Sequence, residues 1–345
     1  MNIIFDATKL KHPNTGLYHF TKELALALNK EIANDKFSIS FLIPKRLFGI
    51  FGNARYIALK FYHRMTIFSP KKAVLWHSTF QMSPYLPPKK VKVLITVHDL
   101  NFLYEKNKRK RLRRLSLLQK NIDRADKVVA ISEFSKMDLM RNIDIKGKNI
   151  KVIYNGCNLY DGEHTEPKNK PQKPFLFSLG IILPKKNWHV LPCLLQDNDY
   201  SLLIAGKLSD YSLKIKEEAK KYGVEDRLIM LGEISEAEKH WYLNNCSAFL
   251  FPSIAEEFGL PVIEAMAYGK PIFLSQHTSL PEIGGKYAYY FDKDFNREKM
   301  KMEFENGMKD FPINRDIEEE KQYARSFSWE RSAKEYAEIY RELSK

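Results

Sequence analysis

Short apolar runs alternate with amphipathic stretches along the first half of the chain. Runs bounded by polar or turn-forming residues are typical of buried strands, and apolar residues three or four positions apart are typical of helices. The predicted strands cover residues 3–5, 39–43, 73–76, 93–97, 128–131 and 152–154, and the predicted helices cover residues 17–28 and 134–140. This alternation favours an α/β domain with a doubly wound, mostly parallel sheet.

A polar, proline-rich segment at residues 161–174 interrupts this pattern and has the composition of a linker. The alternation then restarts, with strands predicted at residues 175–179, 202–205, 228–231, 248–251, 272–274 and 287–291 and helices near 210–222 and 236–245. We therefore expect two Rossmann-like domains, 1–165 and 166–326, that face each other across a cleft. Ligands of such sheets bind at the carboxyl ends of the strands.

In the segment 251–272, seven residues separate Glu256 from Glu264. Glu256 follows a predicted strand and so lies in a loop at its carboxyl end. Pro261 and Gly269 are typical of the first turn of a helix and of the left-handed residue after its last turn. Glu264 therefore belongs to the helix that follows the loop.

The backbone amides of Phe258, Gly259 and Leu260 lie at the predicted start of this helix, where unpaired N–H groups and the helix dipole favour an anion. Carboxylates accept hydrogen bonds from sugar hydroxyls, and amides donate to phosphate oxygens. The segment thus predicts a site for a sugar, a phosphate group and a ribose. Two glutamates at this spacing also occur by chance on surface helices, so the prediction depends on the whole string.

The string from Glu256 to Pro271 resembles the nucleotide-sugar signature E-[GS]-F-G-L-P-x-x-E-A-M-A-x-G-x-P of the retaining GT-B glycosyltransferases of family 4, with Glu257 where that family has a small residue. The resemblance implies the GT-B fold of two doubly wound domains and a nucleoside diphosphate sugar donor. It also implies that Glu256 orients donor hydroxyls, that Glu264 holds the ribose, and that a helix in residues 327–345 packs back across the linker.

Other segments resemble further strings of the family. Lys185 and Lys186 take the positions of the arginine and lysine that hold the donor diphosphate. A lysine in place of arginine keeps the charge but loses the bidentate fork. The resemblance further implies that Gly16 approaches the donor phosphate, that His98 lies beneath the donor sugar, and that main-chain groups at Ile234 bind the nucleobase. Because Asp99 directly follows His98, we expect it to fix the tautomer of that histidine.

Composition narrows the class of protein. The chain has 345 residues, enough for two domains, and its three cysteines are far apart, which fits a reducing compartment. No signal peptide and no stretch of 18 apolar residues is evident, so we expect a cytoplasmic protein. Two Asp-x-Asp strings, at 197–199 and 292–294, have ordinary turn chemistry. We therefore expect no metal and no cofactor.

The net charge of +14 indicates a polyanionic partner. Residues 45–72 and 106–118 mix lysine and arginine with aromatic or leucine residues, as in helices that lie on an anionic bilayer. An ordinary solvated basic face is the alternative. Because both segments fall in the first half, we expect a membrane-facing surface there and a peripheral association with the inner face of the plasma membrane.

Together these features predict an enzyme similar to bacterial O-antigen and capsule mannosyltransferases, which would move a hexose from a nucleoside diphosphate sugar, best guessed as GDP-mannose, to a lipid-linked glycan. His98, Glu256 and Lys186 are the predicted catalytic residues. A GT-B-fold sugar-nucleotide 2-epimerase is the first alternative, and it would need no acceptor. A nucleic-acid-binding protein would explain the charge but would leave the glutamate string without a purpose.

Overall fold

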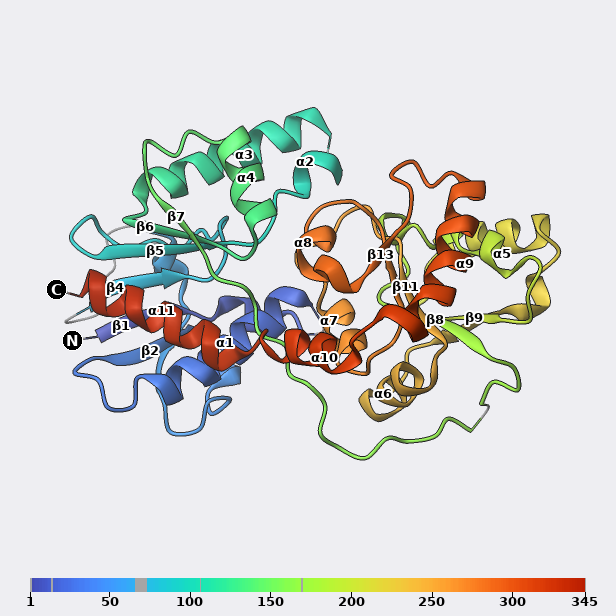
Figure 1. Ribbon diagram of the computed structural model, residues 1–345. Coiled ribbons are helices and arrows are strands. Elements are labelled where there is room, and N and C mark those ends of the chain that lie inside the picture. Colours follow the sequence, from blue (N-terminus) through green and yellow to red (C-terminus); the bar gives the residue numbers. More distant parts are fainter. Residues whose placement is uncertain (1, 14, 66–72, 106, 169, 345) are drawn as a thin grey trace. The chain divides into compact units, whose positions relative to one another are not determined.

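The computed structural model describes residues 2–13, 15–65, 73–105, 107–168 and 170–344. Within it the chain divides into two compact units (Figure 1). The first unit comprises Met1–Gly156 together with Phe327–Lys345, and the second comprises Cys157–Ser326. Each unit contains one parallel sheet with helices on both faces, so the predicted fold class of two Rossmann-like α/β domains is confirmed.

The first sheet has the strand order β3-β2-β1-β4-β5-β6-β7. Its strands are β1 (Asn2–Asp6), β2 (Ser38–Ile43), β3 (Arg55–Ala58), β4 (Ala73–Ser78), β5 (Lys92–Val97), β6 (Lys127–Ala130) and β7 (Ile150–Val152). The central register is set on β1, where Ile3 pairs with Ile39 on one side and with Leu75 on the other. This order places β1 and β4 at the point where the winding reverses, the usual ligand position of such sheets.

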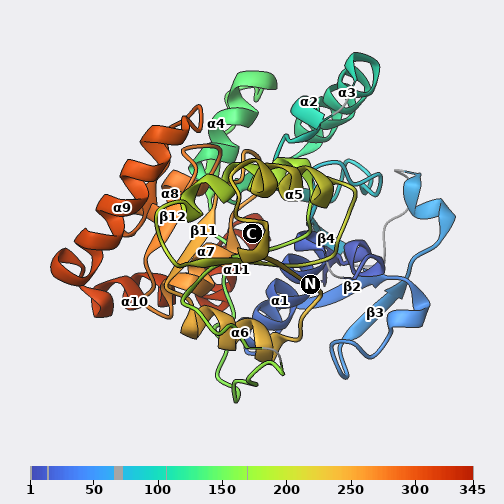
Figure 2. The ribbon, with the colours of Figure 1, turned by 90° about the vertical axis from the view of Figure 1, so that its right-hand side faces the viewer.

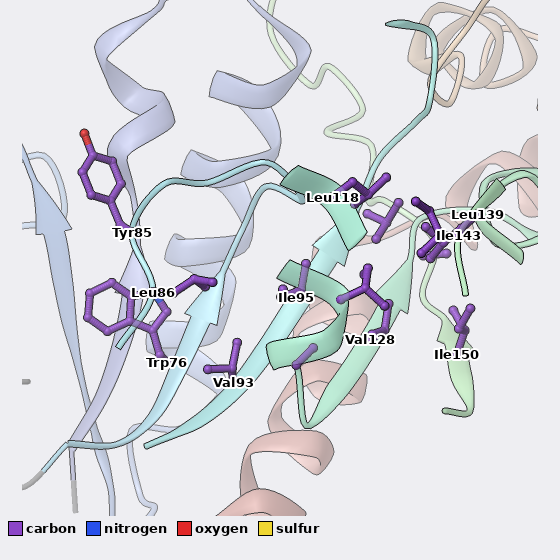
Figure 3. Packing of buried hydrophobic residues seen from close by; sticks show 14 of the residues in the cluster. Trp76, Tyr85, Leu86, Val93, Ile95, Leu118, Val128, Leu139, Ile143 and Ile150 are labelled. Atoms are coloured by element: carbon purple, nitrogen blue, oxygen red, sulfur yellow. The ribbon is translucent and has the colours of Figure 1, made fainter. Parts of the chain in front are cut away.

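The helices of the first unit are α1 (Gly16–Glu31), α2 (Phe102–Glu105), α3 (Lys108–Arg124), α4 (Glu133–Asn142) and α11 (Trp329–Leu343). Successive side chains of a strand point to opposite faces. Val93 and Ile95 of β5 pack with Leu118 of α3 and Leu139 of α4 (Figure 3). On the other face, the Thr96 hydroxyl lies 2.9 Å from the Tyr336 hydroxyl of α11, which packs against α1.

One sequence-based expectation for this unit is wrong. Residues 45–65 do not form a membrane-type helix: they contain two 3₁₀ turns and the edge strand β3, which pairs with β2. Of the aromatic residues that suggested an apolar helix face, Tyr56 lies in this strand, whereas Phe61 and Tyr62 lie in a 3₁₀ turn. Residues 66–72 lie outside the described residues. The second basic segment does form a helix, α3.

The second sheet has the order β10-β9-β8-β11-β12-β13, which repeats the winding of the first. Its strands are β8 (Phe175–Leu179), β9 (Ser201–Ala205), β10 (Leu228–Gly232), β11 (Ala248–Phe251), β12 (Ile272–Leu274) and β13 (Tyr289–Tyr290). The predicted strands are all present, although the last is shorter than expected because a 3₁₀ turn occupies Gly285–Tyr287.

The helices of the second unit are α5 (Tyr211–Lys221), α6 (Glu236–Asn245), α7 (Leu260–Met266), α8 (Leu280–Gly284), α9 (Arg297–Asn314) and α10 (Ile317–Arg325). Figure 2 shows α10 close to α7, against which it packs. The segment predicted as a linker contacts α6, because the Thr165 amide donates to the Ala237 carbonyl. Directly before this segment, the Tyr160 ring stacks on the His240 ring at 4.3 Å. Among the described residues, no helix is both long and apolar enough to cross a membrane.

Candidate functional site

Three neighbouring strands of the second sheet end in glycines with a left-handed backbone. Gly180, Gly206 and Gly232 follow or close β8, β9 and β10 with φ values of 143°, 140° and 73°. The Gly206 amide donates to the Gly232 carbonyl, and the Gly180 amide donates to the Ala205 carbonyl. A side chain at Gly206 would collide with the backbone of Gly180. These three strands therefore end in backbone without side chains, and beside Gly232 no described atom occupies the space of a side chain, so a ligand can approach the backbone closely there.

Lys186 and Glu256 form an ion pair beside this edge of the sheet. The Nζ of Lys186 lies 2.6 Å from Oε1 of Glu256, and the two side chains are only 11% and 13% exposed. The ammonium also lies 4.6 Å from the centre of the Phe251 ring, a cation–π distance. The two residues come from loops after β8 and β11, which are adjacent strands. The sheet topology thus brings together two residues that the sequence placed in separate motifs.

The loop of Glu256 is fastened to the loop of the lysines by Ser253. Its hydroxyl lies 2.6 Å from Oε1 of Glu256 and 3.0 Å from the Lys185 carbonyl oxygen. The Ile254 amide donates to the same carbonyl at 2.8 Å. The backbone of Lys185 therefore supports the loop, while the Lys186 side chain carries the charge at Glu256.

The turn before α7 has the form expected from its sequence. Gly259 is the N-cap of the helix with φ of 103°, and Pro261 lies in the first turn. Phe258 is buried, and its carbonyl accepts a hydrogen bond from the Ser279 hydroxyl at 3.2 Å. The Glu256 amide donates to the Thr278 hydroxyl at 3.1 Å, so the loop after β12 supports this turn from the other side.

Glu264 lies in α7 and pairs with a lysine of the neighbouring helix. The Nζ of Lys239 in α6 is 2.8 Å from Oε1 of Glu264 and 2.7 Å from Oε2 of Glu236. Burial lowers the pKa of Lys239, but the two carboxylates outweigh burial and raise the pKa above its usual value. Ile234 lies just before α6 and is half-buried, in the loop that follows β10.

His98 and Gly16 lie in the first unit. His98 is buried at the carboxyl end of β5, and its Nε2 lies 2.9 Å from the Thr79 carbonyl oxygen. A carbonyl oxygen can only accept, so the proton of the His98 ring is on Nε2 and Nδ1 is free to accept a hydrogen bond. The expectation that Asp99 fixes this tautomer is therefore wrong, because the Thr79 carbonyl does so. Burial lowers the pKa of His98 to about 4, so its ring is neutral at physiological pH.

Gly16 is the first residue of α1 and is exposed. The Thr15 hydroxyl caps the helix by accepting a hydrogen bond from the Tyr18 amide at 3.2 Å. This leaves a helix N-terminus directly after the loop that follows β1, where the dipole favours an anion. That the backbone at Gly16 approaches the donor phosphate stays a prediction.

Sequence reasoning missed Ser253, Thr278 and Lys239. Ser253 stands within the segment 251–272 and Thr278 lies six residues after it, and a serine or threonine in a loop can form hydrogen bonds that hold the loop to a neighbouring one. Lys239 carried no local signal, because its partner Glu264 is 25 positions away on another helix. Among the residues that the structure describes, no cluster of histidine, cysteine or acidic side chains could hold a metal ion.

The chain matches two family models in succession. Residues 35–160 match Glycosyltransferase Family 4, and residues 161–322 match Glycosyl transferases group 1. The two matches correspond to two Rossmann-like units with the strand orders described above, which is the GT-B class of glycosyltransferases. The chain therefore belongs to the family 4 glycosyltransferases, as its glutamate string suggested.

Curated relatives include mannosyltransferases of surface polysaccharides. The chain is 27% identical over 203 residues to the O-antigen chain mannosyltransferase RfbU of Salmonella typhimurium, a match that covers 58% of this chain and 56% of that protein. It is 24% identical over 333 residues to an O-antigen chain mannosyltransferase B of Escherichia coli, covering 83% and 85%. The chain thus spans little more than half the length of the first of these relatives.

Solved structures share the whole fold. A sucrose-phosphate synthase from Thermosynechococcus elongatus superposes on this chain with a TM-score of 0.75 at 18% identity. The match covers 99% of each of the two chains. The lipopolysaccharide outer core galactosyltransferase WaaB superposes with a TM-score of 0.69 at 16% identity over 99% of this chain and 100% of that chain. At these identities the likeness concerns the fold alone.

Proposed function

We propose that this glycosyltransferase transfers a hexose from a nucleoside diphosphate sugar to a membrane-linked glycan during the synthesis of a surface polysaccharide. The observation that carries the proposal is the Lys186–Glu256 ion pair, which stands beside the backbone-lined edge of the second sheet and next to the turn at Gly259. This arrangement offers a cation and amides for a diphosphate and a carboxylate for sugar hydroxyls. The mannosyltransferase relatives favour GDP-mannose as the donor.

In the proposed reaction the bond between the sugar C1 and the diphosphate oxygen breaks, and a bond from C1 to the acceptor hydroxyl oxygen forms on the same face. The acceptor proton passes to the leaving phosphate, so no separate base is needed. Lys186, Lys185 and the amides near Gly16 would stabilise the charge that develops on the leaving group. Glu256 would orient donor hydroxyls, and Glu264 would hold the ribose.

Neutral His98 would serve as a hydrogen-bond partner of the donor sugar. Its pKa of about 4 argues against a role as a proton donor at physiological pH. Phe258, Gly259 and Leu260 would present amides to the phosphate groups, and the backbone at Ile234 would contact the base. We propose that the reaction needs no metal ion.

The surface of α3 supports a membrane-linked acceptor. Its first two turns expose Lys108, Arg109, Lys110 and Arg113, and Leu112 beside them is 58% exposed. Basic side chains with an exposed leucine suit a surface of anionic lipid. We therefore propose that the enzyme works at the inner face of the plasma membrane as a peripheral protein.

A donor panel tests the proposal. GDP-mannose and a set of UDP-sugars would be incubated with the enzyme and a short glycan acceptor, and both the nucleoside diphosphate released and the product anomer would be measured. We expect release with GDP-mannose, retention at C1, and full activity in a chelator. Glu256→Gln is the inactive control. Conversion of a UDP-sugar to its 2-epimer without an acceptor would instead establish the epimerase alternative.

A further inference from the structure

Lys239 is a lysine on the buried side of a helix. In α6 it precedes Tyr242 and Leu243, which are both buried, and its own side chain is only 11% exposed. The periodicity of a helix predicts an apolar residue at such a position. Burying a charged pair costs desolvation energy, and an apolar residue of similar size is often as stable. Stability alone therefore does not account for a lysine here.

The position of the Lys239 ammonium links two helices. It contacts Glu236 in the first turn of α6 and Glu264 in α7, at 2.7 Å and 2.8 Å. The loop that contains Ile234 ends at the N-cap Ser235 of α6, whereas Glu264 belongs to the helix after the Gly259 turn. Lys239 therefore connects the element proposed to contact the base with the element proposed to contact the ribose.

The ion pair with Lys239 engages only one of the two oxygens of the Glu264 carboxylate. Within the described part of the chain, the hydrogen bonds and ion pairs of this side chain reach Oε1 alone. A carboxylate with one oxygen held by an ammonium has its plane and its second oxygen fixed in direction. A fixed acceptor binds a hydroxyl without the entropic cost of ordering a free side chain.

We propose that Lys239 is a positioning residue for nucleotide recognition: its ammonium holds Oε1 of Glu264 so that Oε2 accepts a hydrogen bond from a ribose hydroxyl of the nucleoside diphosphate. The inference rests on the proposed function, because it takes the ligand of Glu264 to be a nucleotide. It assigns to α6 a part in recognising the ribose that its own sequence does not indicate.

The test compares a ribonucleotide with an analogue that lacks the ribose hydroxyls. Binding of GDP and of 2′,3′-dideoxy-GDP to the full chain would be measured by calorimetry, with UDP and 2′,3′-dideoxy-UDP in parallel. Lys239→Met should weaken ribonucleotide binding about tenfold, roughly the worth of one hydrogen bond to a charged group. It should leave binding of the dideoxy analogue unchanged. Lys239→Arg should restore most of the lost affinity.

Two controls separate positioning from packing. Lys301→Met removes a similarly enclosed lysine of the same unit, whose partner is Asp197, and should change neither affinity. The double variant of Lys239→Met with Glu264→Gln should bind GDP no more weakly than Glu264→Gln alone. Equal weakening of both nucleotide forms by Lys239→Met would mean that the lysine only supports the fold, and would overturn the inference.

The failure of the proposed function has a different signature. A wild-type protein that binds none of the four nucleotides would overturn the proposed function and this inference with it. A wild type that prefers the ribonucleotide, combined with a Lys239→Met variant that keeps the same preference, would overturn the inference and leave the proposed function standing.

Discussion

The Nζ of Lys186 lies 2.6 Å from Oε1 of Glu256, although 70 positions separate the two residues in the chain. The pair is largely buried, so neither charge is well solvated. A buried pair of this kind fixes both side chains at the edge of the sheet where the loops after β8 and β11 meet. It gives the candidate site a defined arrangement of charge. Replacing either residue alone should therefore change both activity and stability.

Lys186→Ala should lose more activity than Lys185→Ala. Lys186 holds its ammonium at Glu256, whereas Lys185 supports the loop through its backbone carbonyl, which the substitution keeps. For Lys186→Ala we expect a fall in kcat/KM that corresponds to about 2–4 kcal/mol of lost transition-state stabilisation, as for the loss of one oxyanion-stabilising donor. Rates of nucleoside diphosphate release would measure this. A more severe loss for the Lys185 variant would show that we have assigned the roles of the two lysines wrongly.

The same ion pair predicts an effect on stability. Lys186→Ala leaves the Glu256 carboxylate buried without its ammonium, which costs about 3–5 kcal/mol when the site is fully enclosed. Lys186→Met combined with Glu256→Gln removes both charges and should regain much of this loss while remaining inactive. Urea unfolding would measure both variants. If the double variant were as unstable as the single one, the ion pair would not be the cause.

Neutralising the exposed end of α3 should release the enzyme from acidic vesicles. Each lysine or arginine near an anionic surface contributes about 1 kcal/mol, and the attraction decays within a Debye length. The variant would carry glutamine at Lys108, Arg109, Lys110 and Arg113. Arg111 and Arg114 would be kept, because they contact the Leu103 carbonyl and the Phe102 ring.

Sedimentation with vesicles that contain acidic lipids, at low and high salt, would measure this binding. The matched control replaces four exposed lysines of α5 with glutamine, at Lys214, Lys216, Lys220 and Lys221. Turnover on a short soluble acceptor should be unchanged in both variants. Equal sedimentation of the α3 variant and the wild type would make the cluster an ordinary solvated face. Lost turnover on the soluble acceptor would place these side chains at the acceptor.

The first unit should lose stability in mild acid. Burial lowers the pKa of His98 to about 4 and that of His77 to about 3. An unfolded histidine takes up a proton near pH 6.5, whereas these two stay neutral in the folded state, so stability is lost as pH falls from 6.5 towards 4. Within this window the free energy of unfolding should fall by about 1.4 kcal/mol per pH unit for each histidine.

Hydrogen exchange of peptides from the first unit, followed across this pH range, would measure the effect. His98→Gln should reduce the pH dependence of the stability of the first unit, because it removes the contribution of one of the two buried histidines. His12, which is exposed, provides the matched control, and His12→Gln should leave the pH dependence as it is in the wild type. A pH-independent first unit would contradict the prediction.

The second unit should respond in the opposite direction through Glu320. This residue of α10 is fully buried, and neither of its carboxyl oxygens has a hydrogen-bond partner among the described residues. Burial raises its pKa from 4.5 to about 8. Between these values the folded state keeps a proton that the unfolded state has lost, so stability falls as pH rises and levels off above 8.

Glu320→Gln cannot ionise, so its stability relative to the wild type should rise by about 1.4 kcal/mol for each pH unit between 4.5 and 8. Urea unfolding at pH 5, 7 and 9 would measure the difference. Glu318→Gln on the exposed side of the same helix is the matched control. A constant difference between Glu320→Gln and the wild type across this range would rule out ionisation of Glu320 as the cause.

The sequence by itself determined the local elements and the kind of chemistry. Apolar runs placed nearly all strands, and β8 and β11 have the predicted bounds, because a strand buried on both faces needs a continuous apolar run. Pro261 and Gly269 located α7 and hence Glu264, since both residues act on the backbone locally. The strand β3 was missed because its short run lies among basic residues at a sheet edge.

Only the tertiary structure decided which of these residues meet. The order of strands in the second sheet places β11 beside β8, and this alone brings Glu256 to Lys186. The packing of α6 against α7 brings Lys239 to Glu264, and the Thr79 carbonyl, not the adjacent Asp99, sets the tautomer of His98. These contacts join residues far apart in sequence, and side-chain periodicity records only that a face is buried, not which partner covers it.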